Sequence, residues 1–127
     1  DEMNVQLTTF GKLSKNDKVW KLKYQEITPE NGPHLITITM NDETVTMNRE
    51  GELSTSMVFK LGQRHEGMLS TPFGILDMGV YPTKVEFNVD DEGAGKIFLK
   101  YQLDLGGRFA SFHNLNIDFA PNKAARA

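Results

Sequence analysis

Apolar and polar residues alternate with a period of two in segment after segment of this chain, and Gly, Pro, Asn and Asp interrupt the alternation at short intervals. Such alternation is typical of β-strands with one buried face, and no segment shows the 3.6-residue period of a long amphipathic helix. The pattern therefore predicts an all-β protein. We expect strands at residues 4–10, 18–25, 34–40, 43–49, 53–61, 66–70, 73–81, 83–90, 96–105 and 108–119.

The predicted strands are short, evenly spaced and joined by loops of hairpin length. This arrangement favours an antiparallel up-and-down meander, in which each strand pairs with its neighbour in sequence. Because an open sheet would leave two unpaired edges, we expect the meander to close into a small barrel. The 127 residues suit one domain. We place this domain at residues 1–120, followed by a flexible C-terminal tail at 121–127.

The apolar residues also predict how neighbouring strands align, because a shift of one residue would turn a strand's apolar set to the other face. Across the turn at residues 41–44, Ile38 is expected to face Met47. Across a turn at residues 50–52, Val45 is expected to face Met57.

In the last hairpin, the simplest turn does not align the apolar residues of the two strands. A two-residue turn at Gly106-Gly107 would pair Tyr101 with Phe112 and leave the apolar residues of the last strand on the wrong face. A three-residue loop at residues 106–108, or a bulge beyond the turn, restores the match. Tyr101 then faces His113, and Leu103 faces Ser111.

The alternation predicts which residues point inward. They are Ile36, Ile38, Met40, Val45, Met47, Met57, Phe59, Met68, Leu76, Met78, Val80, Val85, Phe87, Val89, Ile97, Leu99, Tyr101, Leu103, Leu115, Ile117 and Phe119. Five of the six methionines belong to this set. Methionine can form an adaptable wall for an apolar ligand, or it can fill gaps in an ordinary core. The sequence leaves both interpretations open.

Candidate ligand-binding residues follow from this inward set. His113 is one of its few polar members, opposite Tyr101 and next to Asn114. These three residues could hold the polar end of a ligand, or Tyr101 and His113 could form a self-satisfied pair in the core. With Met57, Met78 and Phe87 as apolar contacts, they form the predicted site. No catalytic residue is assigned.

Metal and cofactor sites are not expected. The chain has no cysteine, which excludes disulfides and thiolate ligands. His34, His65 and His113 lie on separate segments without the close spacing of a zinc motif. The acidic run at residues 90–92 lacks the alternating ligands of a calcium loop, so a solvated turn is expected there.

Charge argues against nucleic acid and membrane partners. Lys plus Arg number 14 against 17 Asp plus Glu, a net charge of −3, whereas both partners select a concentrated positive field. No uncharged apolar run approaches the roughly 20 residues that span a bilayer. The lysines at positions 12, 15, 18, 21 and 23 surround Trp20 and Tyr24, but the alternation turns the aromatic rings inward and the lysines outward.

Several residues and short motifs in the second half of the chain carry a resemblance to one protein family. They are Met57 and Phe59 before Gly62, the turn Thr71-Pro72-Phe73-Gly74, Val80 and Thr83, Gly95 before Ile97 and Tyr101, and the final Asn114-Leu115-Asn116-Ile117. In these the sequence resembles the YwiB-like family of bacterial domains of unknown function, with a weaker match back to about Val5. The resemblance implies a cytoplasmic, lipocalin-like or calycin-like β-barrel without assigned activity, cofactor or catalytic residues.

The resemblance also implies one further strand before the segment at residues 4–10. The chain starts Asp1-Glu2-Met3, so either that strand is missing or the barrel has an open edge. An open edge would be covered by strand addition from a second copy, giving a symmetric homodimer.

Three functions are considered. The first is a non-enzymatic barrel that binds a small, largely apolar ligand in its lumen or mouth. The alternative is a protein-protein interaction module that uses a strand edge or the outer face around Lys21 and Lys23. The third is a small enzyme that uses Tyr101 and His113. The volume of the interior separates the first hypothesis from the others.

Overall fold

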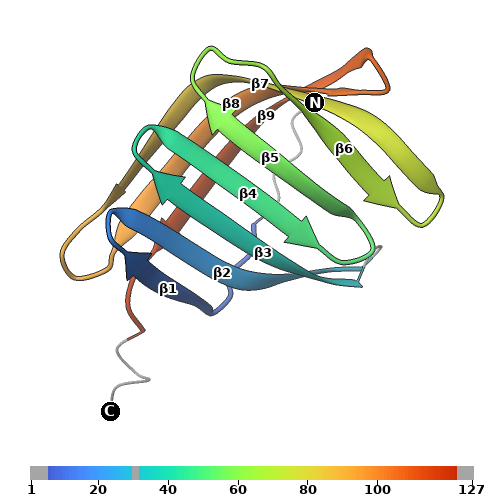
Figure 1. The fold of residues 1–127 in the computed structure, drawn as a ribbon. Helices are drawn as coiled ribbons and strands as arrows, with labels where there is room; N and C mark the ends of the chain where they lie inside the picture. Colours follow the sequence, from blue (N-terminus) through green and yellow to red (C-terminus); the bar gives the residue numbers. More distant parts are fainter. Residues whose placement is uncertain (1–5, 30–31, 123–127) are drawn as a thin grey trace.

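The computed structural model describes residues 6–29 and 32–122, which form one antiparallel sheet with its strands in sequence order (Figure 1). The strands in the described part are β1 (Gly11–Asn16), β2 (Val19–Thr28), β3 (Gly32–Asn41), β4 (Thr44–Glu50), β5 (Ser54–Lys60), β6 (His65–Thr71), β7 (Gly74–Val89), β8 (Gly95–Leu105) and β9 (Arg108–Phe119). The all-β meander predicted from the sequence is confirmed.

The sheet curls so that β7, β8 and β9 run behind β1 to β5 (Figure 1). Its strand order begins at β1 and ends at β9, and these two strands do not pair with each other in the described residues. The described chain is therefore a curled half-barrel, and the predicted closure into a full barrel is not seen in it. Within residues 6–29 and 32–122 no helix is long and apolar enough to cross a membrane.

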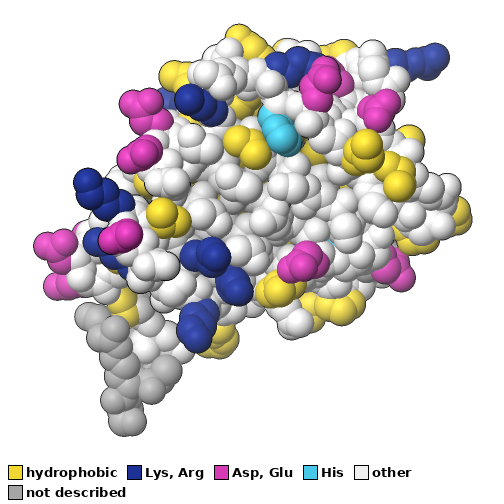
Figure 2. Space-filling model, in the orientation of Figure 1, with side chains coloured by type: hydrophobic (Ala, Val, Ile, Leu, Met, Phe, Trp, Pro, Cys, Tyr) yellow, Lys and Arg dark blue, Asp and Glu magenta, His cyan; other side chains and the backbone are white. Residues whose placement is uncertain are grey.

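The curled sheet has an inner face, which carries the core, and an outer face, which meets solvent. Figure 2 looks onto the outer face of β2 to β5, where uncharged polar groups cover a broad area and charged side chains lie around it. Alternation along each strand assigns every residue to one face. Thus Leu22 and Ile38 point inward, while Lys21 and Thr37 lie on the outer face.

Two strand predictions are corrected. Of the strand predicted at 4–10, residues 6–10 form no strand and residues 4 and 5 lie outside the described residues; the first strand of the described chain is β1 at Gly11–Asn16. Asp17 adopts a positive φ of 57°, which Asp tolerates in a tight turn, so β1 returns directly into β2. The segments 73–81 and 83–90 form a single strand, β7, with an irregularity between Pro82 and Lys84. Pro82 has no backbone N–H to donate there.

The predicted registers are confirmed in one hairpin and shifted in the next. Ile38 faces Met47 across β3 and β4. Across β4 and β5, however, Met57 faces Met47 instead of Val45. The connection before β5 is longer than predicted, and within it the Ser54 hydroxyl donates to the Gly51 carbonyl at 3.0 Å. A shift of two residues keeps every side chain on its predicted face.

The last hairpin combines a tight turn with a bulge. Leu105 faces Arg108 across Gly106 and Gly107, whose φ angles are 63° and 79°. Ala110 is then left without a partner between the pairs Asp104–Phe109 and Leu103–Ser111. The three-residue loop is therefore wrong and the bulge is right. The predicted pairing of Tyr101 with His113 is confirmed.

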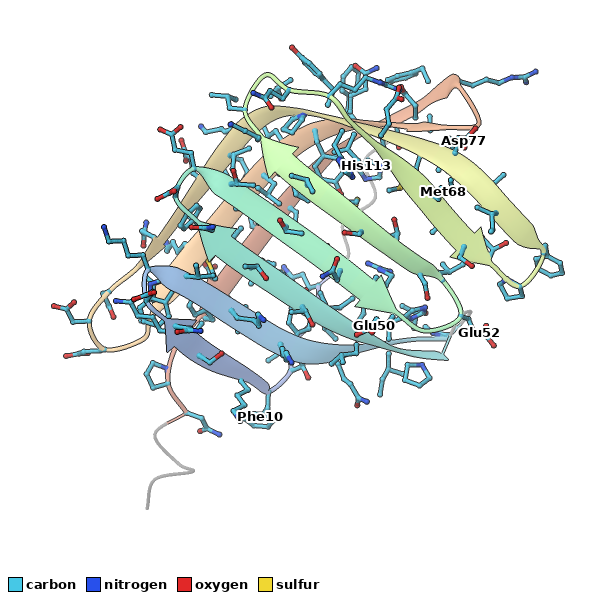
Figure 3. All side chains as sticks on the ribbon, in the orientation of Figure 1. Phe10, Glu50, Glu52, Met68, Asp77 and His113 are labelled. Atoms are coloured by element: carbon cyan, nitrogen blue, oxygen red, sulfur yellow. The ribbon has the colours of Figure 1, made fainter. Side chains whose placement is uncertain are left out.

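The core lies between the two layers of the curled sheet. Its buried apolar members are Leu22, Ile36, Ile38, Met40, Val45, Met47, Met57, Phe59, Met78, Val80, Ile97 and Leu99. Met68 was predicted to join them, but it is 61% exposed. The two-residue turn at Pro72 and Phe73 pairs Met68 with Asp77 on the outer face (Figure 3), and Leu69 packs on the core in its place.

Candidate binding site on the inner face

Tyr101 and His113 form a stacked pair on the inner face of β8 and β9. Their ring centroids lie 5.2 Å apart and their planes differ by 16°. Tyr101 also meets Phe59 edge to face, with the centroids 4.9 Å apart. His113 Nε2 lies 2.5 Å from Ser111 Oγ, and burial lowers the pKa of the His113 imidazole below its ordinary value. His113 therefore hydrogen-bonds to Ser111 and not to the Tyr101 hydroxyl.

A second polar group stands on the inner face of β2 and β4. Register places Tyr24 and Arg49 on either side of Ile36. Arg49 Nη1 forms an ion pair with Glu26 Oε1 at 3.0 Å, and about a quarter of each side chain remains exposed. Burial raises the pKa of Tyr24 to about 12, the Glu26 carboxylate adds to this rise, and Arg49 opposes it.

Arg49 connects the two groups. Its positive charge acts on the Tyr101 hydroxyl as well as on Tyr24, although burial dominates and raises the pKa of Tyr101. We call Tyr24, Glu26, Arg49, Tyr101 and His113 the inner polar cluster. Within the described residues neither tyrosine hydroxyl has a hydrogen-bond partner, and neither oxygen is sealed from solvent. Both hydroxyls are therefore available to a guest molecule.

The sequence identified only part of this cluster. Tyr101 and His113 were assigned to it, whereas Glu26 and Arg49 were not proposed as site residues. Their signal was present, since both are charged residues at positions that alternation places on the inner face. A charged side chain at such a position needs a partner or a function.

The other predicted site residues lie in different surroundings. Met57 and Met78 are buried in the core, and Met78 Sδ lies 3.6 Å from the hydroxyl of Thr55, the cross-strand neighbour of Arg49. Phe87 is half-buried on the inner face and pairs with Ile97. Asn114 is exposed on the outer face, because it directly follows the inward-pointing His113.

The interior is filled at its centre. Ile38, Met40, Val45 and Phe59 are fully buried there, so no open lumen runs through this level of the curled sheet. Toward the edge strand β9 the inner face opens, and Leu115 and Ile117 are only partly buried. Any guest of the inner face would therefore bind at the margin of the core, beside the inner polar cluster.

Hollows lie on the outer side of the described sheet as well. One, of about 470 Å³, is lined by residues of β2 to β5, including Lys21, Lys23 and Thr37. Another, of about 460 Å³, contains the Arg64–Asp104 ion pair at 2.6 Å, which lowers the pKa of Asp104. Across the described residues no group of three or more His, Asp or Glu side chains could hold a metal ion.

Comparison with known proteins gives a family and a fold. A family model described as a domain of unknown function, DUF1934, matches residues 1–117. The crystal structure of the ywiB protein from Bacillus subtilis superposes with a TM-score of 0.78 at 20% sequence identity, over 88% of this chain and 75% of that one. At this identity the likeness shows the fold alone. A comparison with curated proteins found no match.

Proposed function

The chain belongs to the DUF1934 family, the YwiB-like bacterial domains of unknown function, and from that premise we propose that it is a non-enzymatic protein that binds a small, largely apolar molecule. In this proposal the ligand lies at the open margin of the inner face. Its polar end meets the inner polar cluster, and its apolar part lies along β9.

The observation that carries the proposal is the positive charge of Arg49, which acts on two tyrosines whose hydroxyls have no partner in the described chain. Buried polar groups are normally hydrogen-bonded. Two hydroxyls left open beside a half-buried guanidinium, next to an apolar wall, therefore suit a guest with one polar end. Methionines in the adjoining core can adjust to the shape of such a guest.

The chemistry of the cluster favours binding over catalysis. A tyrosine hydroxyl is ordinarily protonated at neutral pH, and burial raises the pKa of Tyr24 and Tyr101 further, so that both donate hydrogen bonds and do not act as bases. His113 is already engaged with Ser111. The ligand's polar end is accordingly a hydrogen-bond acceptor, such as a carbonyl or a carboxylate oxygen.

Native mass spectrometry of protein purified from cells tests the proposal, with added decanoic acid as a defined probe. We expect a bound small molecule or, in its absence, binding of the probe. The double variant Tyr24→Phe/Tyr101→Phe keeps both rings but removes both donors. At about 1 kcal/mol for each hydrogen bond, its affinity should fall roughly tenfold or more.

Tyr81→Phe is the matched control, because Tyr81 lies on the outer face. It should bind as the wild type does. Equal occupancy in the double variant and the wild type would contradict the proposal, as would the absence of any bound mass from both the purified and the probed protein.

A second candidate function is protein binding at a sheet edge. The edge strand β9 carries Phe109 and Phe112, which meet edge to face at 5.1 Å and are 57% and 74% exposed. Exposed aromatic rings beside unpaired backbone groups are typical of strand-addition sites.

A further inference from the structure

The hollow over β2 to β5 is lined mainly by outer-face residues, and Arg49 of the inner polar cluster also contributes to its lining. It measures about 470 Å³, and the residues that line it include Lys21, Lys23, Thr37, Asn48, Glu50 and Ser54. Figure 2 shows dark blue side chains gathered over β2, beside a broad area of uncharged polar groups. A volume of this size lies within the usual range of small-molecule sites.

Lys23, which lines one end of the hollow, faces another lysine without a counter-charge. Lys23 stands directly opposite Lys12 across β1 and β2. Of the ion pairs found in the described residues, none involves Lys12, Lys21 or Lys23. Like charges directly opposite each other destabilise a strand pair. An anion bound between these lysines would remove that repulsion.

Neutral hydrogen-bond donors continue the row of lysines across the sheet. Lys23 faces Thr37 on β3, and Thr37 faces Asn48 on β4. Thr37 is only 9% exposed although it belongs to the outer face, yet its hydroxyl is not sealed from solvent. Neither Thr37 nor Asn48 has a side-chain hydrogen bond within the described chain. An ammonium, a hydroxyl and an amide are therefore aligned and open to a ligand.

Acceptors at the opposite end indicate what else the ligand carries. Glu50 lies there, and the Ser54 hydroxyl is already bonded to Gly51. A carboxylate repels a second anionic group but accepts hydrogen bonds from hydroxyls. The hollow is thus positive at β2, and near the end of β4 it offers Glu50 as an acceptor, since the neighbouring Arg49 is already paired with Glu26.

We propose that this hollow binds the phosphate monoester of a small hydroxylated molecule. The phosphate lies against Lys21, Lys23 and Thr37, where charge-assisted hydrogen bonds are strongest. The hydroxyl groups of the ligand extend past Asn48 toward Glu50. Arg49 lines this hollow and also belongs to the inner polar cluster, where it is paired with Glu26, so the phosphate is placed at the lysine end of the hollow, on β2 and β3.

Titration of the full chain with glycerol 3-phosphate, followed by backbone amide NMR and calorimetry, tests the proposal. The largest shifts are expected on β2, β3 and β4. The double variant Lys21→Gln/Lys23→Gln removes two charge-assisted contacts and should weaken binding by roughly a hundredfold, at about 1.5 kcal/mol or more for each contact. Thr37→Val should weaken binding severalfold and leave the fold intact.

Lys84→Gln/Lys100→Gln is the control with the same loss of charge, since both lysines lie over Phe98, outside the hollow. It should retain wild-type affinity. Equal weakening in the two double variants would overturn the proposal, because the effect would then be one of overall charge. A lack of shifts on β2 to β4 at millimolar glycerol 3-phosphate would overturn it as well.

Discussion

The ring of His34 packs against the backbone of Gly51 so closely that a Cβ atom at Gly51 would lie 2.5 Å from His34 Cδ2. The same ring accepts a hydrogen bond from the Leu53 backbone N–H to Nε2 at 3.1 Å. His34 is buried, and its Nδ1 has no partner among the described residues. The imidazole therefore packs inside the loop from β4 to β5 and holds it through the contact with Gly51 and the hydrogen bond from Leu53.

Gly51→Ala should destabilise the protein by about 1–3 kcal/mol, because the new methyl group would overlap the His34 ring and the Pro33 carbonyl. Urea unfolding measures the cost. In His34→Ala the closer of the two obstacles, the ring, is gone and only the Pro33 carbonyl remains, so adding Gly51→Ala there should cost less than in the wild type. Glu52→Ala, at an exposed position in the same loop, should change stability by no more than about 0.5 kcal/mol. Additive costs of the two substitutions would show that the contact is unimportant.

The period-two pattern predicted those features that depend on long apolar stripes. It placed Tyr101 opposite His113 because only one register of β8 and β9 keeps Ile97, Leu99 and their partners inside. It failed where a stripe is short or ambiguous. Met68 and Leu69 are adjacent and both apolar, so alternation could not choose between them, and the turn at Pro72-Phe73 decides. The missed strand β1 depends on a turn at Asp17, a local backbone feature and not a stripe.

The site was less accessible to sequence reasoning than the fold. Tyr101 and His113 are cross-strand neighbours, so a single hairpin register brings them together. Arg49 and Glu26 lie on strands separated by β3, and they meet only because long side chains cross a neighbouring strand. The hollow beside Lys23 depends on the curvature of the sheet, which residue alternation does not encode.

Met78 and Met68 offer a matched test of the two faces, since they are 5% and 61% exposed. Met78→Lys would bury an unpaired charge and should cost several kcal/mol, about 3 or more. Met68→Lys should stay within about 0.5 kcal/mol of the wild type. Urea unfolding of both variants gives the comparison, and equal midpoints would show that the assignment of faces on β6 and β7 is wrong.

His113 should make stability depend on pH. Burial lowers its pKa in the folded protein, so the unfolded chain takes up the proton first as the pH falls below about 6.5. Stability is therefore fully present above that pH and declines as the pH falls toward the lowered value. His113→Gln, which retains a hydrogen-bonding group near Ser111, should reduce the loss between pH 7.5 and about pH 5.

Urea unfolding of wild type and variant across this pH range measures the difference. Asn114→Gln, on the opposite face of the same strand, is the control and should keep the wild-type slope. If His113→Gln and Asn114→Gln lose stability equally on acidification, another group is responsible for the decline.

The two edges of the sheet differ in their capacity to pair with another strand. β1 has 6 residues and carries Lys12 and Lys15, and short, lysine-bearing edges resist pairing. β9 has 12 residues and exposes Phe109 and Phe112. If the chain forms a homodimer through an open edge, as the sequence led us to expect, β9 is the strand that pairs with its copy.

We therefore expect sedimentation equilibrium to show a monomer–dimer equilibrium that Phe112→Lys shifts toward monomer, because a lysine on an edge strand opposes the approach of a second copy carrying the same charge. Phe73→Lys is the matched control. Phe73 is fully exposed but belongs to the turn between β6 and β7, away from either edge, so this variant should associate as the wild type does. A wild-type chain that remains monomeric at high concentration, or a dimer that both substitutions weaken equally, would rule out pairing through β9.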